Sequence, residues 1–149
     1  MQERSMHPEG YTMSDANKAV VREYYRLLDS GNTDGMKAIF HDDLNWNFVG
    51  IGELNTESIG GVVQAFKAVF PDMQHAVGDQ SAEGTTVTTP VVFTGTHQGE
   101  LMGIPASGAS VTFRGINIHE VVDGRIKSAE TVVDMMGMMQ QIGAIPTPG

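Results

Sequence analysis

Side chains that could transfer protons gather in residues 116–137, INIHEVVDGRIKSAETVVDMMG. His119 is a candidate base, because imidazole exchanges protons near neutral pH. Glu130 is a candidate acid, and Asn117 and Thr131 add hydrogen-bonding groups. The segment therefore predicts proton-transfer chemistry, provided that these side chains face a pocket.

Two acidic residues in this segment have competing structural roles. Glu130 and Asp134 share one face of a strand with period two. Asp134 stands where the next helix needs an N-cap, and we favour that role. Glu130 has two open interpretations, since an inward carboxylate needs a partner or a pocket, whereas an outward one needs neither.

The turn at Asp123-Gly124 decides which of these residues share a face. In a two-residue turn, Val122 pairs with Arg125. Asn117 then lies opposite Glu130, and Glu130 becomes a pocket carboxylate.

A turn one residue longer, with a glycine bulge, gives the opposite result. Val121 then pairs with Arg125, and Thr131 joins the face of Asn117. Glu130 moves to the reverse face, because a one-residue slip exchanges the two faces of a strand.

The elements that must position these residues follow from hydrophobic periodicity. Ser14, Thr33 and Thr56 are expected to begin three helices, and Pro90 predicts an edge position or a bulge in its strand. The expected helices span 15–30, 33–40 and 57–70; the expected strands span 43–50, 73–82, 85–97, 110–122 and 125–134, and a last helix begins near 134. Helices followed by strands indicate the α+β class.

Length and composition limit the classes of function. The 149 residues suit one domain, expected over 14–149 after a flexible tail over 1–13. A net charge of -9 disfavours nucleic acid as a partner. No apolar run approaches the ~20 residues of a membrane span, so we expect no membrane partner and a cytoplasmic location.

Known cofactor and metal motifs do not appear in the sequence. The five histidines lack a metal-site spacing, and the chain has no cysteine. We interpret HDD at 41–43 as a surface turn and the methionines at 135–139 as core or dimer-contact residues. No phosphate-binding loop is present. The sequence therefore predicts no metal and no cofactor.

Three segments resemble the SnoaL-like polyketide cyclases of the nuclear transport factor 2-like superfamily. They are FPDM (70–73), FTGTHQGELMGIPASGASVTFRGINIHEVVDGRI (93–126) and DMMGMMQQIG (134–143). The resemblance implies a cone-shaped α+β barrel, with three N-terminal helices on a strongly curved antiparallel sheet around an apolar pocket. It also implies a homodimer or a higher homo-oligomer. Cyclases of this family close a polyketide ester by an intramolecular aldol reaction without metal or organic cofactor.

The resemblance carries over residue by residue to the candidate site. The pocket aspartate of the characterised cyclases aligns with Thr131, and an assisting histidine aligns with Asn117. Placing both in the pocket implies the bulged register, which we favour, with His119 on the same face nearer the turn. The residues expected to bind substrate are Trp46, Phe113, Tyr24, Leu28 and Ala129. Trp46 also fits a core role on its strand.

Three functions remain open at this point. The first is a cyclase or isomerase that acts on a polyketide-like apolar carbonyl compound, in which Asn117 orients the substrate oxygen and His119 moves the proton. The second is a binding protein for a small apolar molecule, which the loss of the aspartate at Thr131 favours. The third is an epoxide hydrolase or epoxide-opening cyclase, which requires Glu130 in the pocket.

Overall fold

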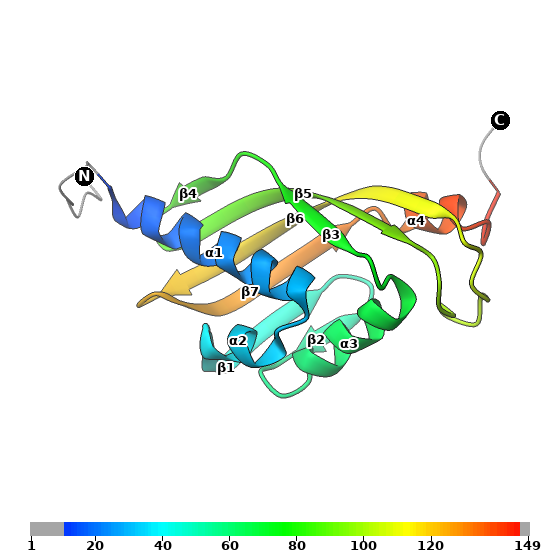
Figure 1. Cartoon of the computed structure of the whole chain (residues 1–149). Helices are drawn as coiled ribbons and strands as arrows, with labels where there is room; N and C mark the ends of the chain where they lie inside the picture. The colour runs from blue at the N-terminus through cyan, green and yellow to red at the C-terminus, as the bar shows by residue number, and fades with distance from the viewer. Residues whose placement is uncertain (1–10, 147–149) are drawn as a thin grey trace.

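The computed structural model describes residues 11–146, which form four helices and a curved open sheet (Figure 1). The helices are α1 (Met13–Ser30), α2 (Thr33–Ala38), α3 (Ile59–Val69) and α4 (Met135–Gln141). The strands are β1 (Phe40–Phe48), β2 (Gly52–Leu54), β3 (Gln74–Val77), β4 (Ser81–Glu83), β5 (Thr86–Thr96), β6 (Ser110–Val122) and β7 (Arg125–Val133). The predicted α+β class, with three N-terminal helices and a short C-terminal one, is confirmed. The expected tail falls mostly outside the described residues, and Met13 already belongs to α1.

The sheet follows the order β2-β1-β7-β6-β5-β3, and β4 also pairs with β5. All these pairs are antiparallel except β1 and β7, which run parallel. The expected strand over 73–82 is two strands, β3 and β4, and β2 is an additional short strand. β1 arrives from the helical half of the chain and joins the β5–β6–β7 meander at its free edge, which extends the sheet beside the candidate segment.

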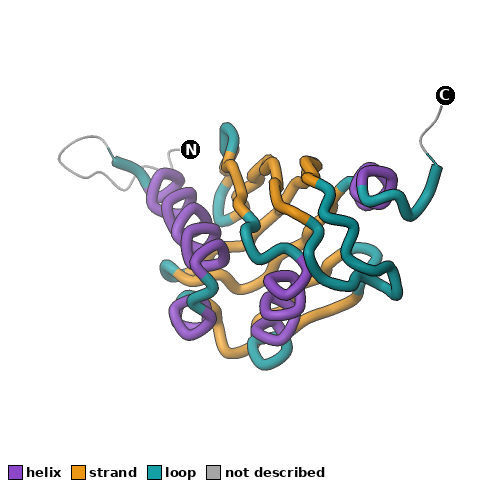
Figure 2. The backbone as a smooth tube through the Cα atoms, turned by 45° about the vertical axis from the view of Figure 1, so that its right-hand side comes forward, coloured by secondary structure: helices purple, strands orange, loops and turns teal. Residues whose placement is uncertain are grey.

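The helices lie on the concave side of the sheet. Figure 2 shows α1 and α3 on the same side of the strands, with α4 near one end. α1 turns its apolar face to the sheet, and its buried residues recur at helical spacing: Asn17, Val21, Tyr24, Tyr25, Leu27 and Leu28. Gly31 ends α1 in the left-handed conformation (φ 74°), which glycine adopts without steric cost.

The helix N-caps differ from those expected. Thr12, not Ser14, caps α1 in a capping box: the Asp15 N–H donates to Thr12 Oγ1 (3.1 Å), and the Thr12 N–H donates to the Asp15 carboxylate (3.0 Å). Asn32, not Thr33, caps α2. The third helix starts at Ile59, after Thr56. The boundaries move by up to two residues, but the helices themselves are as predicted.

α4 is fixed at both of its ends. The Asp134 carboxylate accepts a hydrogen bond from the Gly137 N–H (2.8 Å), which confirms the predicted N-cap. The Gln141 side chain bonds both backbone groups of Thr112 in β6, at 2.7 and 2.8 Å. α4 therefore lies against the sheet and buries Met138, while Met136 points to solvent.

Pro90 lies in the middle of β5, inside the sheet, so the expected edge position is wrong, but the pairing on its β3–β4 side is irregular there. β5 pairs continuously with β6 here (Pro90 opposite Ile116), while on its other side β3 pairs up to Val91 and β4 from Thr88. The Pro90 carbonyl accepts a hydrogen bond from the Gly78 N–H (2.8 Å). Because the N and carbonyl of one strand residue point to the same side, the missing Pro90 N–H faces the gap between β3 and β4. No ladder hydrogen bond is lost there.

The β6–β7 hairpin combines features of both proposed registers. Asp123 (φ 54°) and Gly124 (φ 75°) form a two-residue turn with positive φ at both positions, and Val122 pairs with Arg125. One residue later, Lys127 is an extra residue in β7 that shifts the register.

The Lys127 bulge decides which side chains face inward. Asn117 pairs with Thr131, and both are buried; Ile118 pairs with Glu130, which is exposed. The turn and its Val122–Arg125 pair are those of the two-residue register, whereas Asn117 faces Thr131 and not the partner that either register predicted. The face assignment of the favoured one is right.

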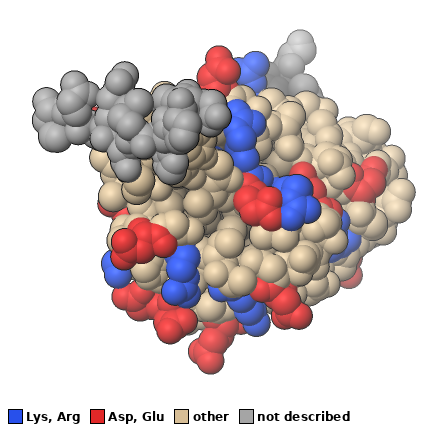
Figure 3. Space-filling model, turned by 60° about the vertical axis from the view of Figure 1, so that its left-hand side comes forward, with Lys and Arg blue, Asp and Glu red and all other residues tan. Residues whose placement is uncertain are grey.

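Charged side chains are interspersed on the surface. On the face in Figure 3, acidic and basic residues lie among each other and form no continuous basic patch. Residues 41–43, expected in a surface turn, belong to β1, and Asp43 pairs with Lys127 across the β1–β7 edge (3.1 Å). Within residues 11–146, no helix is long and apolar enough to cross a membrane.

Candidate active site

A cavity of about 90 Å³ lies between the concave face of the sheet and helices α1, α3 and α4. Its walls are almost entirely apolar. They comprise Tyr24, Tyr25, Leu28, Trp46, Phe48, Leu54, Ile59, Val62, Val63, Phe66, Met73, His75, Val91, Phe93, Phe113, Gly115, Asn117, Thr131, Val133, Met135 and Met138. Two aromatic pairs stack within these walls, Phe48 with Phe66 and Phe93 with Phe113. The walls suit a flat apolar ligand.

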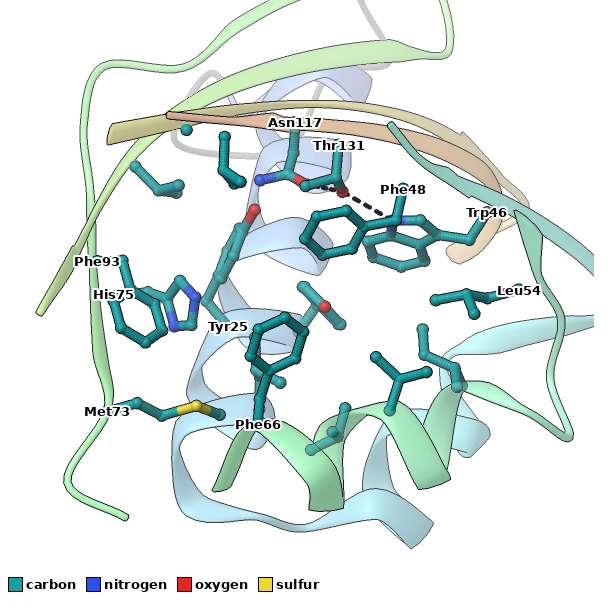
Figure 4. A pocket seen from close by; sticks show the side chains of 18 of the residues that line it. Tyr25, Trp46, Phe48, Leu54, Phe66, Met73, His75, Phe93, Asn117 and Thr131 are labelled. Atoms are coloured by element: carbon teal, nitrogen blue, oxygen red, sulfur yellow. Dashed lines mark hydrogen bonds between the residues drawn. The ribbon is translucent and has the colours of Figure 1, made fainter. Parts of the chain in front are cut away.

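Three polar side chains form a hydrogen-bond chain at one end of the cavity (Figure 4). Trp46 Nε1 donates to Thr131 Oγ1 (2.7 Å), and the Thr131 hydroxyl donates to Asn117 Oδ1. All three residues are at most 6% exposed. They come from β1, β7 and β6, which the parallel β1–β7 pair and the Lys127 bulge bring side by side.

The chain runs in one direction. Trp46 Nε1–H can only donate, so Thr131 Oγ1 accepts from it. The Thr131 hydroxyl in turn donates to the Asn117 carbonyl oxygen, which is the atom facing Thr131. The Asn117 NH₂ group therefore points away from Thr131 with its two N–H donors.

Tyr25 lies beside this free amide. Its hydroxyl is buried and points toward Asn117, without closing a hydrogen bond of normal geometry to any described residue (Figure 4). Burial, and secondarily the neighbouring Tyr24, raise the pKa of Tyr25 well above its usual value. The phenol therefore stays protonated at neutral pH. Together with the Asn117 amide, it offers hydrogen-bond donors at the polar end of the cavity.

His75 lines the side of the cavity and pairs with Asp29, which lies outside the lining. His75 Nδ1 lies 2.6 Å from Asp29 Oδ1, and the His75 backbone N–H donates to Asp29 Oδ2 (2.7 Å). The two side chains are 12% and 14% exposed. The His75 ring packs between Tyr25 and Phe93, with ring centroids 5.3 and 5.2 Å away (Figure 4).

His119, the predicted base, lies behind the cavity wall. It shares the inward face of β6 with Asn117, but it is fully buried and does not line the cavity. The rings of Trp46, Tyr24 and Tyr25 surround it at 5.1 to 6.3 Å. Burial lowers the pKa of His119 to about 3, so its imidazole is neutral at physiological pH. Along β6, the cavity lining ends at Asn117, because α1 covers His119, the next residue that faces inward.

The other predicted site residues divide into two groups. Four of the five expected substrate-binding residues line the cavity: Trp46, Phe113, Tyr24 and Leu28. Ala129 is buried opposite His119, outside the lining. Glu130 is exposed on the reverse face, because the Lys127 bulge turns it outward, so it cannot serve as a cavity acid.

Sequence reasoning missed three polar residues and part of the walls. Tyr25, Asp29 and His75 belong to the site, and Met135 and Met138 line the cavity besides packing in the core. Alternation was the available signal for His75, since it lies two residues after Met73 in a strand that faces inward. Asp29 follows Tyr25 by one helical turn, which places both on one face of α1.

The GTHQGE segment has a structural role in a loop. His97 is fully buried, and its Nδ1 lies 2.8 Å from Ser107 Oγ. A Cβ on Gly99 would lie 2.3 Å from the Ala68 carbonyl oxygen, so only glycine permits this approach to α3. Neither His97 nor Gly99 lines the cavity.

Comparisons with known proteins agree with this architecture. The model of the SnoaL-like polyketide cyclase family matches residues 18–142. The aklanonic acid methyl ester cyclase DauD of Streptomyces sp. strain C5 is 29% identical over 139 residues, covering 87% of this chain and 83% of DauD.

Solved structures show the same fold. IdmH from Streptomyces antibioticus has a TM-score of 0.79 at 29% identity, covering 85% of this chain and 98% of IdmH. A SnoaL-like protein from Jannaschia sp. CCS1 has a TM-score of 0.83 at 20% identity, covering 98% of this chain and all of that one (100%). The fold, the apolar cavity and the match over most of the chain agree: the protein belongs to the SnoaL-like polyketide cyclase family.

Proposed function

We propose that the protein is a cofactor-independent cyclase that closes a ring in a polyketide-like ester by an intramolecular aldol reaction. The observation that carries the proposal is the polar end of an otherwise apolar cavity, where the Asn117 amide and the Tyr25 hydroxyl lie side by side. The similarity to the aklanonic acid methyl ester cyclase DauD supports this reaction class.

The reaction is an isomerisation and needs no co-reactant. A base removes a proton from a carbon beside a carbonyl, and the resulting carbanion attacks a second carbonyl carbon. That carbonyl's π electrons move to its oxygen, which takes up a proton and becomes a hydroxyl. Donors held in place at this oxygen stabilise its developing charge, which can lower the barrier by about 3 kcal/mol per donor.

The residues have distinct proposed roles. The Asn117 amide and the Tyr25 hydroxyl donate to the substrate oxygen. Thr131 and Trp46 position the Asn117 amide through the chain of hydrogen bonds. Phe113, with Tyr24, Trp46 and Leu28, holds the apolar body of the substrate. Thr131 stands where the resemblance implies an aspartate, so the base must come from another residue.

The cavity must widen to admit such a substrate. Its volume of about 90 Å³ is below the ~300 Å³ or more typical of ligand sites. Met135 and Met138 at the α4 wall are unbranched and flexible, and their movement enlarges the site at small cost.

Incubation with aklanonic acid methyl ester tests the proposal. Chromatography with mass spectrometry should show a new compound of unchanged mass, with one carbonyl converted to a hydroxyl. Recovery of the unchanged ester after saturable binding would instead identify a binding protein, the function that the missing aspartate favours.

The exposed position of Glu130 removes the acid that the epoxide-opening hypothesis required.

A further inference from the structure

The His75–Asp29 pair has the geometry of a base with its orienting carboxylate. Both Asp29 carboxylate oxygens act as acceptors, one for the His75 backbone N–H (2.7 Å) and one for His75 Nδ1 (2.6 Å). An ionised carboxylate can only accept, so His75 Nδ1 carries the proton. In the neutral ring, the lone pair then resides on Nε2.

His75 Nε2 is available for chemistry. It has no hydrogen-bond partner among the described residues, in contrast to Nδ1. The ring lines the cavity, where Tyr25 and Phe93 hold it from two sides. In Figure 4, His75 lies on one side of Tyr25 and the Asn117–Thr131 pair on another. A base and the oxyanion donors thus border the same cavity from different walls.

We infer that His75 is the catalytic base of this cavity and that Asp29 is its positioning residue. The inference rests on the proposed aldol function and supplies the proton acceptor that Thr131 cannot provide. His75 Nε2 removes the proton from the carbon beside the carbonyl, and the C–H electron pair forms the new C–C bond. The protonated ring then returns this proton to the alkoxide. One proton is moved within the site, and neither an oxidant nor a second substrate is needed.

A purely structural role is the competing explanation, because the pair also joins the end of α1 to β3. Asp29→Asn separates the two explanations. An asparagine can still accept from the His75 backbone N–H, while its NH₂ group donates to Nδ1. The hydrogen bonds are kept, but the proton moves to Nε2, which then has no lone pair to accept a substrate proton.

The first experiment measures the tautomer by ¹H–¹⁵N NMR of the full chain, without any substrate. We expect Nδ1–H for His75 in the wild type and Nε2–H in Asp29→Asn. An Nε2–H tautomer in the wild type overturns the inference, whatever the protein catalyses.

The second experiment measures kcat, KM and melting temperature with aklanonic acid methyl ester as the probe. We expect His75→Gln and Asp29→Asn each to lower kcat about 10²- to 10⁴-fold, the range for losing a general base. KM and the melting temperature of Asp29→Asn should stay near their wild-type values. The matched control is His41→Gln, which replaces another half-buried histidine, bonded to the Val122 carbonyl and outside the cavity.

The outcomes separate the inference from the proposed function. A wild-type kcat in both His75→Gln and Asp29→Asn overturns the base assignment and leaves the cyclase proposal standing. An inactive wild type whose His75 shows the Nδ1–H tautomer counts against the cyclase proposal, while it supports the assigned geometry of the pair. A changed pH–rate profile in His75→Gln, with residual activity, supports the base assignment, and an unchanged profile counts against it.

Discussion

Trp46 Nε1 donates a hydrogen bond to Thr131 Oγ1 over 2.7 Å, although 85 residues separate the two in the chain. Because indole can only donate, Thr131 Oγ1 accepts here, and the Thr131 hydroxyl itself donates to Asn117 Oδ1. The Asn117 amide group is thereby turned with its N–H donors away from Thr131. One buried hydroxyl therefore orients the group that we propose meets the substrate.

Thr131→Val should disrupt this orientation. The substitution keeps the shape of the side chain but leaves Trp46 N–H and Asn117 Oδ1 without their partner. A buried unsatisfied group costs about 1–3 kcal/mol, and we expect that loss in urea unfolding followed by Trp46 fluorescence. Thr131→Ser, which keeps the hydroxyl, is the control. Equal stability of the two variants would contradict the hydrogen-bond chain.

Glu130→Gln should have almost no effect. The side chain is exposed on the reverse face of the sheet, so its carboxylate is remote from the cavity. We expect turnover of the methyl ester within about twofold of wild type, and stability within about 0.5 kcal/mol, as for other surface substitutions. A large loss of kcat would show that Glu130 reaches the substrate after all.

His119 should make stability depend on pH. Burial lowers its pKa in the folded protein from 6.5 to about 3, so the unfolded chain binds a proton that the folded chain excludes. His119 therefore does not destabilise the folded protein above about pH 6.5. As the pH drops from there toward 3, its contribution lowers the free energy of unfolding, at a rate approaching ~1.4 kcal/mol per pH unit.

His119→Met should remove most of this slope. Methionine also leaves no unpartnered ring nitrogen in the core, where both His119 nitrogens lack partners among the described residues. We expect equal or higher stability at pH 7 and a flatter profile between pH 6.5 and 4, measured by urea unfolding at each pH. An unchanged slope would show that other groups set the acid sensitivity.

The helices and strands were predictable wherever a local residue pattern determines them. The helical spacing of Val21, Tyr24 and Leu28 defines the inner face of α1, and Asp134 marks the start of α4. The face shared by Asn117 and Thr131 was inferred from the resemblance. The Lys127 bulge that produces this shared face could not be inferred from the sequence. It depends on tertiary pairing, because β1 also changes register opposite the same part of β7. Two neighbouring strands jointly impose that irregularity.

The candidate site was predictable only in part. Alternation along β6 places His119 on the same face as Asn117, but it cannot show that α1 covers His119 with Tyr24. Asp29 and His75 lie 46 residues apart, in a helix and a strand with no sequence pattern in common. Such a pair becomes visible only when tertiary packing joins α1 to β3.

A single-turnover reaction with excess enzyme measures what the Asn117 amide contributes to the chemical step. We compare wild type with Asn117→Leu, which keeps a similar volume but removes the amide donors, and with Glu130→Gln as the matched control. We expect conversion of aklanonic acid methyl ester to an isomer of equal mass, about 10²- to 10³-fold slower in Asn117→Leu and unchanged in Glu130→Gln. Equal rates in wild type and Asn117→Leu, or an ester recovered unchanged from the wild type, would contradict this expectation.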